Sequence, residues 1–179
     1  FAFPLSLTKV RRNLVRYAKL FPRETRRGRL LVFRSGGLSI ESEPLGALPD
    51  QPLPVALTAN PICRHHPFLS HKTTHRQMYD SRRALFPAAF DVLLMNEADE
   101  LTEFTTGNLV MALDGRLWTP PLSAGLLPGT FRAHLLARGK IRERLLTKDD
   151  LHRSARLWYI NSVRGWIAVR LQDEAEQVN

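Results

Sequence analysis

The spacing of apolar side chains divides the chain into short helices and strands. After Ser6, apolar residues recur every three or four positions, with Lys and Arg between them. This period predicts a helix that begins at Ser6 as its N-cap and ends at Pro22. The apolar runs 28–34 and 38–44 have the length of strands, and the Ser-Gly-Gly sequence at 35–37 predicts a hairpin turn between them.

A proline-rich stretch follows these elements. Four of the eleven residues from Pro44 to Pro54 are proline, and no apolar period runs through them, which is typical of a linker. One helix and one hairpin are too little for an independent core. We therefore expect residues 1–46 to be the remainder of a small N-terminal α/β domain, 47–53 a linker and 54–179 a larger domain.

The larger domain alternates strands with helices. We expect a helical segment at 71–86, a second helix that ends at Gly139, and a third that Thr147 caps. The stretch 96–132 predicts three strands joined by turns, then a Pro/Gly loop that opens a helix. Further strands are expected at 54–59, 90–96, 140–146, 156–162 and 165–172. This order favours an α+β fold with antiparallel or mixed sheets over a doubly wound parallel sheet.

The composition is that of a globular protein, but the charge is strongly basic. The 179 residues carry a net charge of +9, and the pI is about 10.6. Such a balance raises the possibility of nucleic acid as a partner. The chain has no recognition-helix motif, zinc-finger spacing or aromatic–basic RNA-binding signature, so we expect none. A basic solvated surface, or a field that attracts an anionic small-molecule substrate, accounts for the charge.

Sulfur, histidine and hydropathy patterns exclude several other classes. Cys63 is the single cysteine, so no intrachain disulfide forms, and we expect a cytoplasmic protein. No apolar run has the length of a membrane span, and no signal peptide is recognisable. His65 and His66 lie near Cys63, and His71 and His75 could share a helix face. Without a second cysteine or an HExxH motif, we favour structural or surface histidines and expect no metal.

Three features that can carry chemistry remain. The chain lacks a Walker loop, a GxGxxG motif and a GxSxG elbow. Lys72 is one of few lysines and precedes a helical pattern, and lysine is the common side chain that forms Schiff bases. A surface lysine at a helix start is the alternative. Glu103 lies among Thr, Gly and Asn residues, and the glycine turn that ends at Arg132 enters a helix, where an anion can bind.

The residues around these features resemble, in order, the motifs of fold-type IV pyridoxal-phosphate enzymes, the class IV aminotransferase family. The matching stretches are HKTTHR, FDVLLMNEADELTEFTTGNLVMALDGRLWTP, GLLPGTFR and NSVRGW. The family includes branched-chain and D-amino acid aminotransferases and aminodeoxychorismate lyase. The resemblance covers about residues 1–171. It is greatest to the lyase, especially the lyase domain fused to aminodeoxychorismate synthase component I.

The resemblance implies roles for individual residues and pyridoxal 5′-phosphate as cofactor. Lys72 matches the catalytic Schiff-base lysine, and Glu103 matches the glutamate that faces the pyridine nitrogen. The resemblance also implies that Gly129, Thr130, Phe131 and Ser162 contact the cofactor phosphate. Thr106 and Asn108 would form the site wall or a turn. Arg164 would contact a substrate carboxylate. Phe131 replaces a threonine found in many aminotransferases, and His75 replaces an asparagine that usually follows the lysine by three residues.

The implied reaction is the elimination of pyruvate from 4-amino-4-deoxychorismate, which yields 4-aminobenzoate for folate synthesis. Lys72 takes the C4 proton, and aromatisation drives the step. A class IV aminotransferase, or a truncated member without catalysis, is the alternative. The family's early phosphate-binding arginine has no counterpart after Phe1, so we expect a truncated small domain and weak or absent cofactor binding. The family also implies a homodimer, and a synthase domain as a fusion or working partner.

Overall fold

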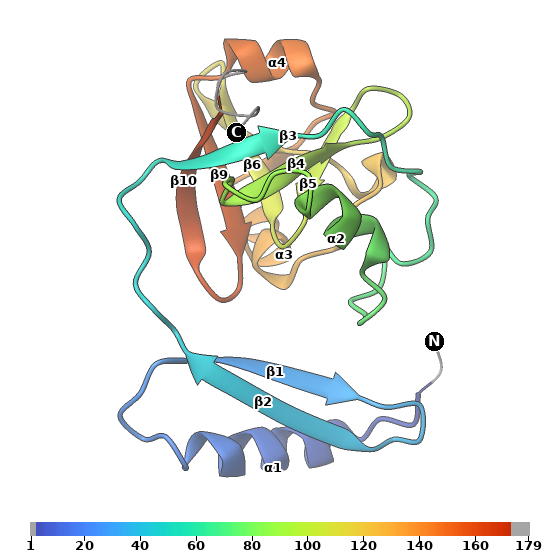
Figure 1. The fold of residues 1–179 in the computed structure, drawn as a ribbon, viewed down its shortest axis with the longest axis vertical. Coiled ribbons are helices and arrows are strands. Elements are labelled where there is room, and N and C mark those ends of the chain that lie inside the picture. The colour runs from blue at the N-terminus through green and yellow to red at the C-terminus, as the bar shows by residue number, and fades with distance from the viewer. Residues whose placement is uncertain (1–2, 173–179) are drawn as a thin grey trace. The chain divides into compact units, whose positions relative to one another are not determined.

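The chain divides into two compact units within the proline-rich stretch. The structure is a computed structural model that describes residues 3–172, and its units are Phe1–Leu48 and Pro49–Asn179 (Figure 1). Each unit has its own secondary structure and is described separately. Together they give the α+β composition with mixed sheets that the alternating pattern predicts.

The first unit is one helix with a two-stranded sheet. Helix α1 (Leu7–Ala18) begins where the Ser6 side chain accepts a hydrogen bond from the Lys9 backbone, so the predicted N-cap is confirmed. Strands β1 (Arg26–Val32) and β2 (Leu38–Pro44) pair antiparallel. The turn between them places Gly36 at a φ of 79°, which glycine adopts without strain.

The second unit is built on one mixed sheet of eight strands in the order β5-β4-β3-β10-β9-β6-β7-β8. The strands are β3 (Leu53–Leu57), β4 (Asp91–Met95), β5 (Leu101–Phe104), β6 (Asn108–Leu113), β7 (Arg116–Thr119), β8 (Arg142–Glu143), β9 (Arg156–Asn161) and β10 (Gly165–Leu171). Its helices are α2 (Gln77–Arg83), α3 (Thr130–Ala137) and α4 (Lys148–Arg153), with a 3₁₀ turn at Leu122–Ala124.

An additional pairing between β5 and β6 closes six of these strands into a ring. Its register pair is Glu103 with Asn108. Because paired residues point to the same face, strand alternation separates an inner from an outer face. Phe104 lies on the inner face, where its ring is 5.5 Å from that of Tyr159 on β9. Glu103 and Asn108 therefore lie on the outer face.

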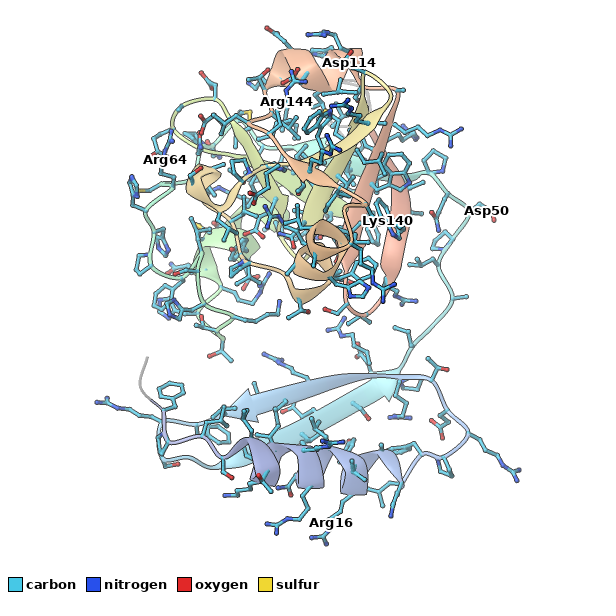
Figure 2. The ribbon with its side chains drawn as sticks, turned by 180° about the vertical axis from the view of Figure 1, so that it is seen from behind. Arg16, Asp50, Arg64, Asp114, Lys140 and Arg144 are labelled. Carbon is cyan, nitrogen blue, oxygen red and sulfur yellow. The ribbon has the colours of Figure 1, made fainter. Side chains whose placement is uncertain are left out.

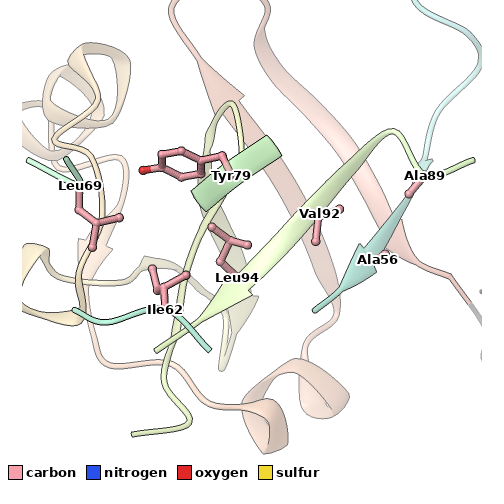
Figure 3. Close-up of a cluster of buried hydrophobic side chains, with 7 residues drawn as sticks. All are labelled: Ala56, Ile62, Leu69, Tyr79, Ala89, Val92 and Leu94. Atoms are coloured by element: carbon pink, nitrogen blue, oxygen red, sulfur yellow. The ribbon is translucent and has the colours of Figure 1, made fainter. Parts of the chain in front are cut away.

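Helices α2 and α3 each pack on apolar residues of this outer face. Helix α2 supplies Tyr79 to a buried cluster that contains Val92 and Leu94 of β4 (Figure 3). Helix α3 supplies Leu135 to a second cluster that contains Val110 of β6. The Glu103–Asn108 pair joins β5, the neighbour of β4 in the sheet, to β6. Glu103 and Asn108 are thus a polar pair on the outer face, which is apolar where α2 and α3 cover it.

Two predicted elements are shorter than the apolar pattern indicates. Helical structure starts at Gln77 rather than at residue 71, because the Thr73 hydroxyl accepts the His75 backbone N–H at 3.1 Å in a local turn. Residues 140–146 form only the two-residue strand β8. Arg144 in that segment instead forms ion pairs with Asp150 at 3.0 Å and with Asp114 at 3.8 Å (Figure 2).

The predicted cap at Thr147 is confirmed. Its hydroxyl accepts the Asp150 backbone N–H, and the Asp150 carboxylate accepts the Thr147 backbone N–H, which forms a capping box. Asp150 also forms an ion pair with Arg144, which lies in the segment that follows α3. This ion pair connects the start of α4 to that segment.

The α2 cluster yields a stability prediction. Leu94 is fully buried, and truncation to alanine leaves a cavity between β4 and α2. We expect Leu94→Ala to lower the free energy of unfolding by about 2–5 kcal/mol, measured by urea denaturation. Leu85→Ala is the matched control because Leu85 is 55% exposed, and it should cost less than about 0.5 kcal/mol. Equal losses in the two variants would contradict this packing.

Candidate active site

A pocket of about 260 Å³ lies in the second unit. Four segments line it: the chain from residue 68 to Tyr79, the β5–β6 region at 103–108, the loop and start of α3 at 127–131, and residues 161–162 at the end of β9. Strand pairing and helix packing bring these segments together from distant parts of the sequence.

Most of the residues singled out in the sequence share this pocket. Arg164 is the exception, since it is not among the described residues that line the pocket, although it lies in the same turn as Ser162. The lining includes Lys72, Glu103, Thr106, Asn108, Gly129, Thr130, Phe131 and Ser162. The structure thus places a lysine, a carboxyl and a glycine turn around one cavity. Their chemical roles remain proposals.

Glu103 is a buried carboxyl held by hydrogen bonds. Its side chain is 3% exposed, and the Tyr79 hydroxyl donates to Oε1 at 2.8 Å. The Asn108 amide donates to Oε2 at 3.4 Å, and the Leu127 backbone N–H also reaches the carboxyl. Burial raises the pKa of Glu103 to about 8, although the hydrogen bonds from Tyr79 and Leu127 and the charges of Lys72 and Arg76 lower it.

Asn108 fixes the glycine turn against the sheet. Its amide also donates to the Leu127 carbonyl at 3.0 Å. A Cβ on Gly129 would lie 2.0 Å from Asn108 Oδ1, so only glycine fits this approach. One side chain on β6 therefore sets the positions of both the carboxyl and the loop that leads into α3.

The start of α3 forms a hydroxyl-lined anion cradle. Gly129 is the N-cap, and the first N–H groups of the eight-residue helix lack intrahelical partners. The Thr130 hydroxyl lies 2.7 Å from the Ser162 hydroxyl, and both side chains are exposed. The Phe131 ring contacts Trp166 instead, so this residue offers the cradle its backbone. Two hydroxyls beside helix N–H groups can bind a phosphate dianion.

Thr106 is a turn-forming residue, one of the two roles expected for it. Its hydroxyl donates to the buried Asp91 carboxylate, which also accepts the Thr105 backbone N–H at 3.0 Å. The Tyr159 hydroxyl donates to the Thr106 carbonyl at 2.8 Å. A Cβ on Gly107 would lie 2.4 Å from the Tyr159 ring, which explains the glycine in this tight turn.

Cationic and aromatic side chains surround Lys72 at the pocket. Lys72 is exposed and lies before α2, in irregular chain rather than at a helix start. His71, His75 and Arg76 line the same wall, and the Phe68 ring lies 4.5 Å from that of His75. No group of three metal-ligating side chains occurs among residues 3–172.

Two further residues of the wall escaped the sequence analysis. Tyr79 fits the apolar period of a helix, and that period conceals its hydroxyl bond to Glu103. Arg76 donates to the Thr105 carbonyl at 2.8 Å and lies over the Tyr79 ring. The short separation of Tyr79 from Lys72, seven residues in the sequence, is the one sequence signal that could have indicated a shared site.

Comparison with known proteins identifies the family. The family model for class IV aminotransferases matches residues 2–171. The chain belongs to this family. Among curated proteins, it is 32% identical over 139 residues to a candidate aminodeoxychorismate lyase of Schizosaccharomyces pombe. The match covers 73% of the chain and 60% of that relative, so the chain spans less than two thirds of the relative's length.

Solved structures of the class IV family share this fold. A candidate amino-acid aminotransferase from Mesorhizobium loti is 33% identical and superposes with a TM-score of 0.88. The match covers 95% of this chain and 84% of the Mesorhizobium loti chain. The 4-amino-4-deoxychorismate lyase from Pseudomonas aeruginosa superposes with a TM-score of 0.79 over 96% of the chain and 72% of its own. At 20% identity, that second likeness supports the fold alone.

Enzymes of the class IV family use pyridoxal phosphate, and the residues of this pocket fit that group. The cofactor has an aldehyde, a basic ring nitrogen and a phosphate. The pocket offers an amine, a buried carboxyl and the cradle at the start of α3. A carboxyl with a pKa of about 8 is mostly protonated at neutral pH, and it can supply a proton to a heterocyclic nitrogen.

No helix in the described part of the chain is long and apolar enough to cross a membrane.

Burial of Glu103 predicts a pH dependence of stability. Its pKa rises from 4.5 to about 8 on folding, so the stabilisation is complete below pH 4.5 and is lost as pH rises through 8. We expect the cofactor-free protein to lose up to about 5 kcal/mol of unfolding free energy across this window. Glu103→Gln should not show this loss of unfolding free energy, and at about pH 9 it should be more stable than the wild-type protein.

Urea denaturation at a series of pH values measures this difference. Glu41→Gln is the control, because Glu41 is exposed on β2 and its replacement removes no buried charge. A wild-type profile parallel to that of Glu103→Gln would show that the Glu103 carboxyl does not resist ionisation.

Proposed function

We propose that the chain is a pyridoxal-phosphate-dependent lyase that converts 4-amino-4-deoxychorismate to 4-aminobenzoate and pyruvate. The observation that carries this proposal is the shared pocket of Lys72, Glu103 and the cradle formed by Gly129, Thr130 and Ser162. The relative of Schizosaccharomyces pombe, named as a candidate lyase, supports the choice of reaction.

Each side chain has a distinct task in this proposal. Lys72 would hold the cofactor covalently until the substrate amine replaces it, and its freed amine would then take the proton from the substrate carbon that bears the amino group. Glu103 shares a proton with the ring nitrogen. When bound, the cofactor supplies an electron sink for the carbon that loses its proton. The backbone of Gly129 and Phe131 and the hydroxyls of Thr130 and Ser162 hold the phosphate.

The pocket wall suits an anionic small-molecule substrate. Lys72 and Arg76 are cationic residues of this wall, whereas Glu103 is the acidic residue that lines the pocket in the described chain. A substrate with carboxylates gains favourable electrostatic interactions at such a wall. Arg164 lies beyond the pocket lining, so a carboxylate contact at Arg164 would be made at the outer rim.

An amino acid aminotransferase is the second candidate function. The Mesorhizobium loti structure, named as a candidate amino-acid aminotransferase, matches at 33% identity over 95% of the chain. Both reactions start with proton removal by the lysine, so the groups around Lys72 and Glu103 serve either one. The two reactions differ after that step, because the lyase releases pyruvate and the aminotransferase transfers the amino group.

The remaining parts of the proposal concern the whole protein. By its resemblance to the family we infer a cytoplasmic homodimer that receives its substrate from an aminodeoxychorismate synthase, fused or separate. A folded family member without catalysis, which serves as a partner-binding domain, is the alternative. Light scattering of the purified chain tests the dimer, and cofactor uptake separates the catalytic from the non-catalytic form.

The first functional prediction concerns cofactor and product. Pyridoxal phosphate, added in excess because weak binding is expected, should produce a visible absorption band that Lys72→Ala abolishes; such a band would show the expectation of absent binding wrong. The loaded protein should release pyruvate from 4-amino-4-deoxychorismate, measured by a coupled dehydrogenase assay. Lys140→Ala is the matched control, because Lys140 lies outside the pocket lining. Amino-group transfer from an amino acid to 2-oxoglutarate without pyruvate release would favour the aminotransferase instead.

The second functional prediction concerns the phosphate. Hydrogen bonds to a charged group contribute about 1.5–3 kcal/mol each. We expect the double variant Thr130→Val, Ser162→Ala to bind pyridoxal phosphate at least about tenfold more weakly, measured by absorption titration. Its affinity for pyridoxal, which lacks the phosphate, should stay unchanged. Ser123→Ala, outside the pocket lining, is the protein control. Equal weakening for both ligands would place the phosphate elsewhere.

A further inference from the structure

Tyr79 places a single hydroxyl between an apolar cluster and the Glu103 carboxyl. The residue is 6% exposed, and its ring belongs to the buried cluster of α2 and β4. Its hydroxyl points away from Val92 and Leu94 (Figure 3). It donates to Glu103 Oε1 at 2.8 Å. A buried phenol needs such a partner, and this one is the carboxyl at the pocket.

The two oxygens of Glu103 are held unequally. Oε1 accepts the short bond from Tyr79, whereas the Asn108 amide contacts Oε2 at 3.4 Å. A hydrogen bond of 2.8 Å between oxygens is well within the strong range, and one of 3.4 Å is weak. Of the two side-chain donors, the one to Oε2 is therefore the weaker, and Oε2 keeps more capacity toward other side chains or a ligand.

Arg76 holds the Tyr79 ring in place. Its guanidinium lies 4.8 Å from the ring centroid, and the same group donates to the Thr105 carbonyl at 2.8 Å. Its Nε lies 3.6 Å from Asp80 on α2. The guanidinium thus connects α2 to the turn after Glu103. Both α2 and the turn after Glu103 therefore fix the distance from the Tyr79 hydroxyl to the Glu103 carboxyl.

We propose that Tyr79 is a positioning residue for Glu103. Its hydroxyl fixes Oε1 and leaves Oε2 to share a proton with the ring nitrogen of the cofactor. The inference rests on the proposed function for the cofactor, but the contact between Tyr79 and Glu103 can be tested without it. Tyr79 does not touch the reacting atoms and acts through Glu103.

A donor to the carboxylate favours its charged form. Three titratable groups face Glu103, namely Lys72, Arg76 and Tyr79, and all lie in or just before α2. The Tyr79 bond lowers the pKa of Glu103 more than the other two do, against the effect of burial. Without the hydroxyl, the carboxyl retains its proton to a higher pH and gives it less readily to a ring nitrogen.

The test compares Tyr79→Phe with wild type by ¹³C NMR of the Glu103 carboxyl carbon in cofactor-free protein. We expect the midpoint of titration to rise by about one pH unit in the variant. With pyridoxal phosphate labelled at the ring nitrogen, the ¹⁵N shift should report up to about a tenfold lower ratio of protonated to neutral nitrogen. A general loss of packing would expose the carboxyl to water and lower its midpoint, which is the opposite of the rise expected here.

Tyr159→Phe is the matched control. Tyr159 is also a buried tyrosine of this unit, but its hydroxyl bonds to Thr106 and Asn161 rather than to Glu103. It should leave the Glu103 midpoint unchanged. An unchanged midpoint in Tyr79→Phe, or an equal rise in both variants, would overturn the proposal. If wild type takes up no pyridoxal phosphate, the proposed function fails, and with it the role toward the ring nitrogen. The ¹³C titration then still decides the contact with Glu103.

Discussion

The pairing of Glu103 with Asn108 is the interaction on which the rest of the site depends. It joins β5 to β6 and so completes the ring of six strands. Because paired residues share a face, it also places a carboxyl and an amide side by side between the surfaces covered by α2 and α3. The strand closure that buries the core therefore also positions the polar centre of the pocket.

Polar contacts extend this centre in two directions. Asn108 binds the Leu127 carbonyl and leaves no room for a side chain on Gly129, so the entrance to α3 is fixed relative to Glu103. On the other side, Tyr79 ties the carboxyl to α2. The lysine lies outside both connections, in exposed chain before α2. The site combines a rigid carboxyl and anion cradle with a lysine whose side chain retains solvent access.

Local chemistry was predictable from the sequence, whereas long-range geometry was not. The caps at Ser6 and Thr147 depend on residues three positions away, and both were predicted correctly. Glu103 and the turn at Gly129 were found through their motifs, since unusual residues in strands and turns have few other uses. The pairings of β3 with β10 and of β6 with β9, which the ring requires, and the bond from Tyr79 join segments that are far apart in the chain. Apolar periodicity records burial, so it marks Tyr79 as core and cannot reveal where its hydroxyl points.

The raised pKa of Glu103 follows from this construction and suits the proposed chemistry. A closed ring and two helices remove water from the carboxyl, and its neutral form becomes favoured up to a pH of about 8. A neutral acid and a neutral heterocycle can meet without the desolvation of two separate charges. The proton then moves from the carboxyl to the heterocyclic nitrogen within a hydrogen bond. The positive charges of Lys72 and Arg76 stabilise the carboxylate that remains. A still higher pKa would hold the proton on the carboxyl, so the hydrogen bond from Tyr79, which favours the charged form, limits the effect of burial.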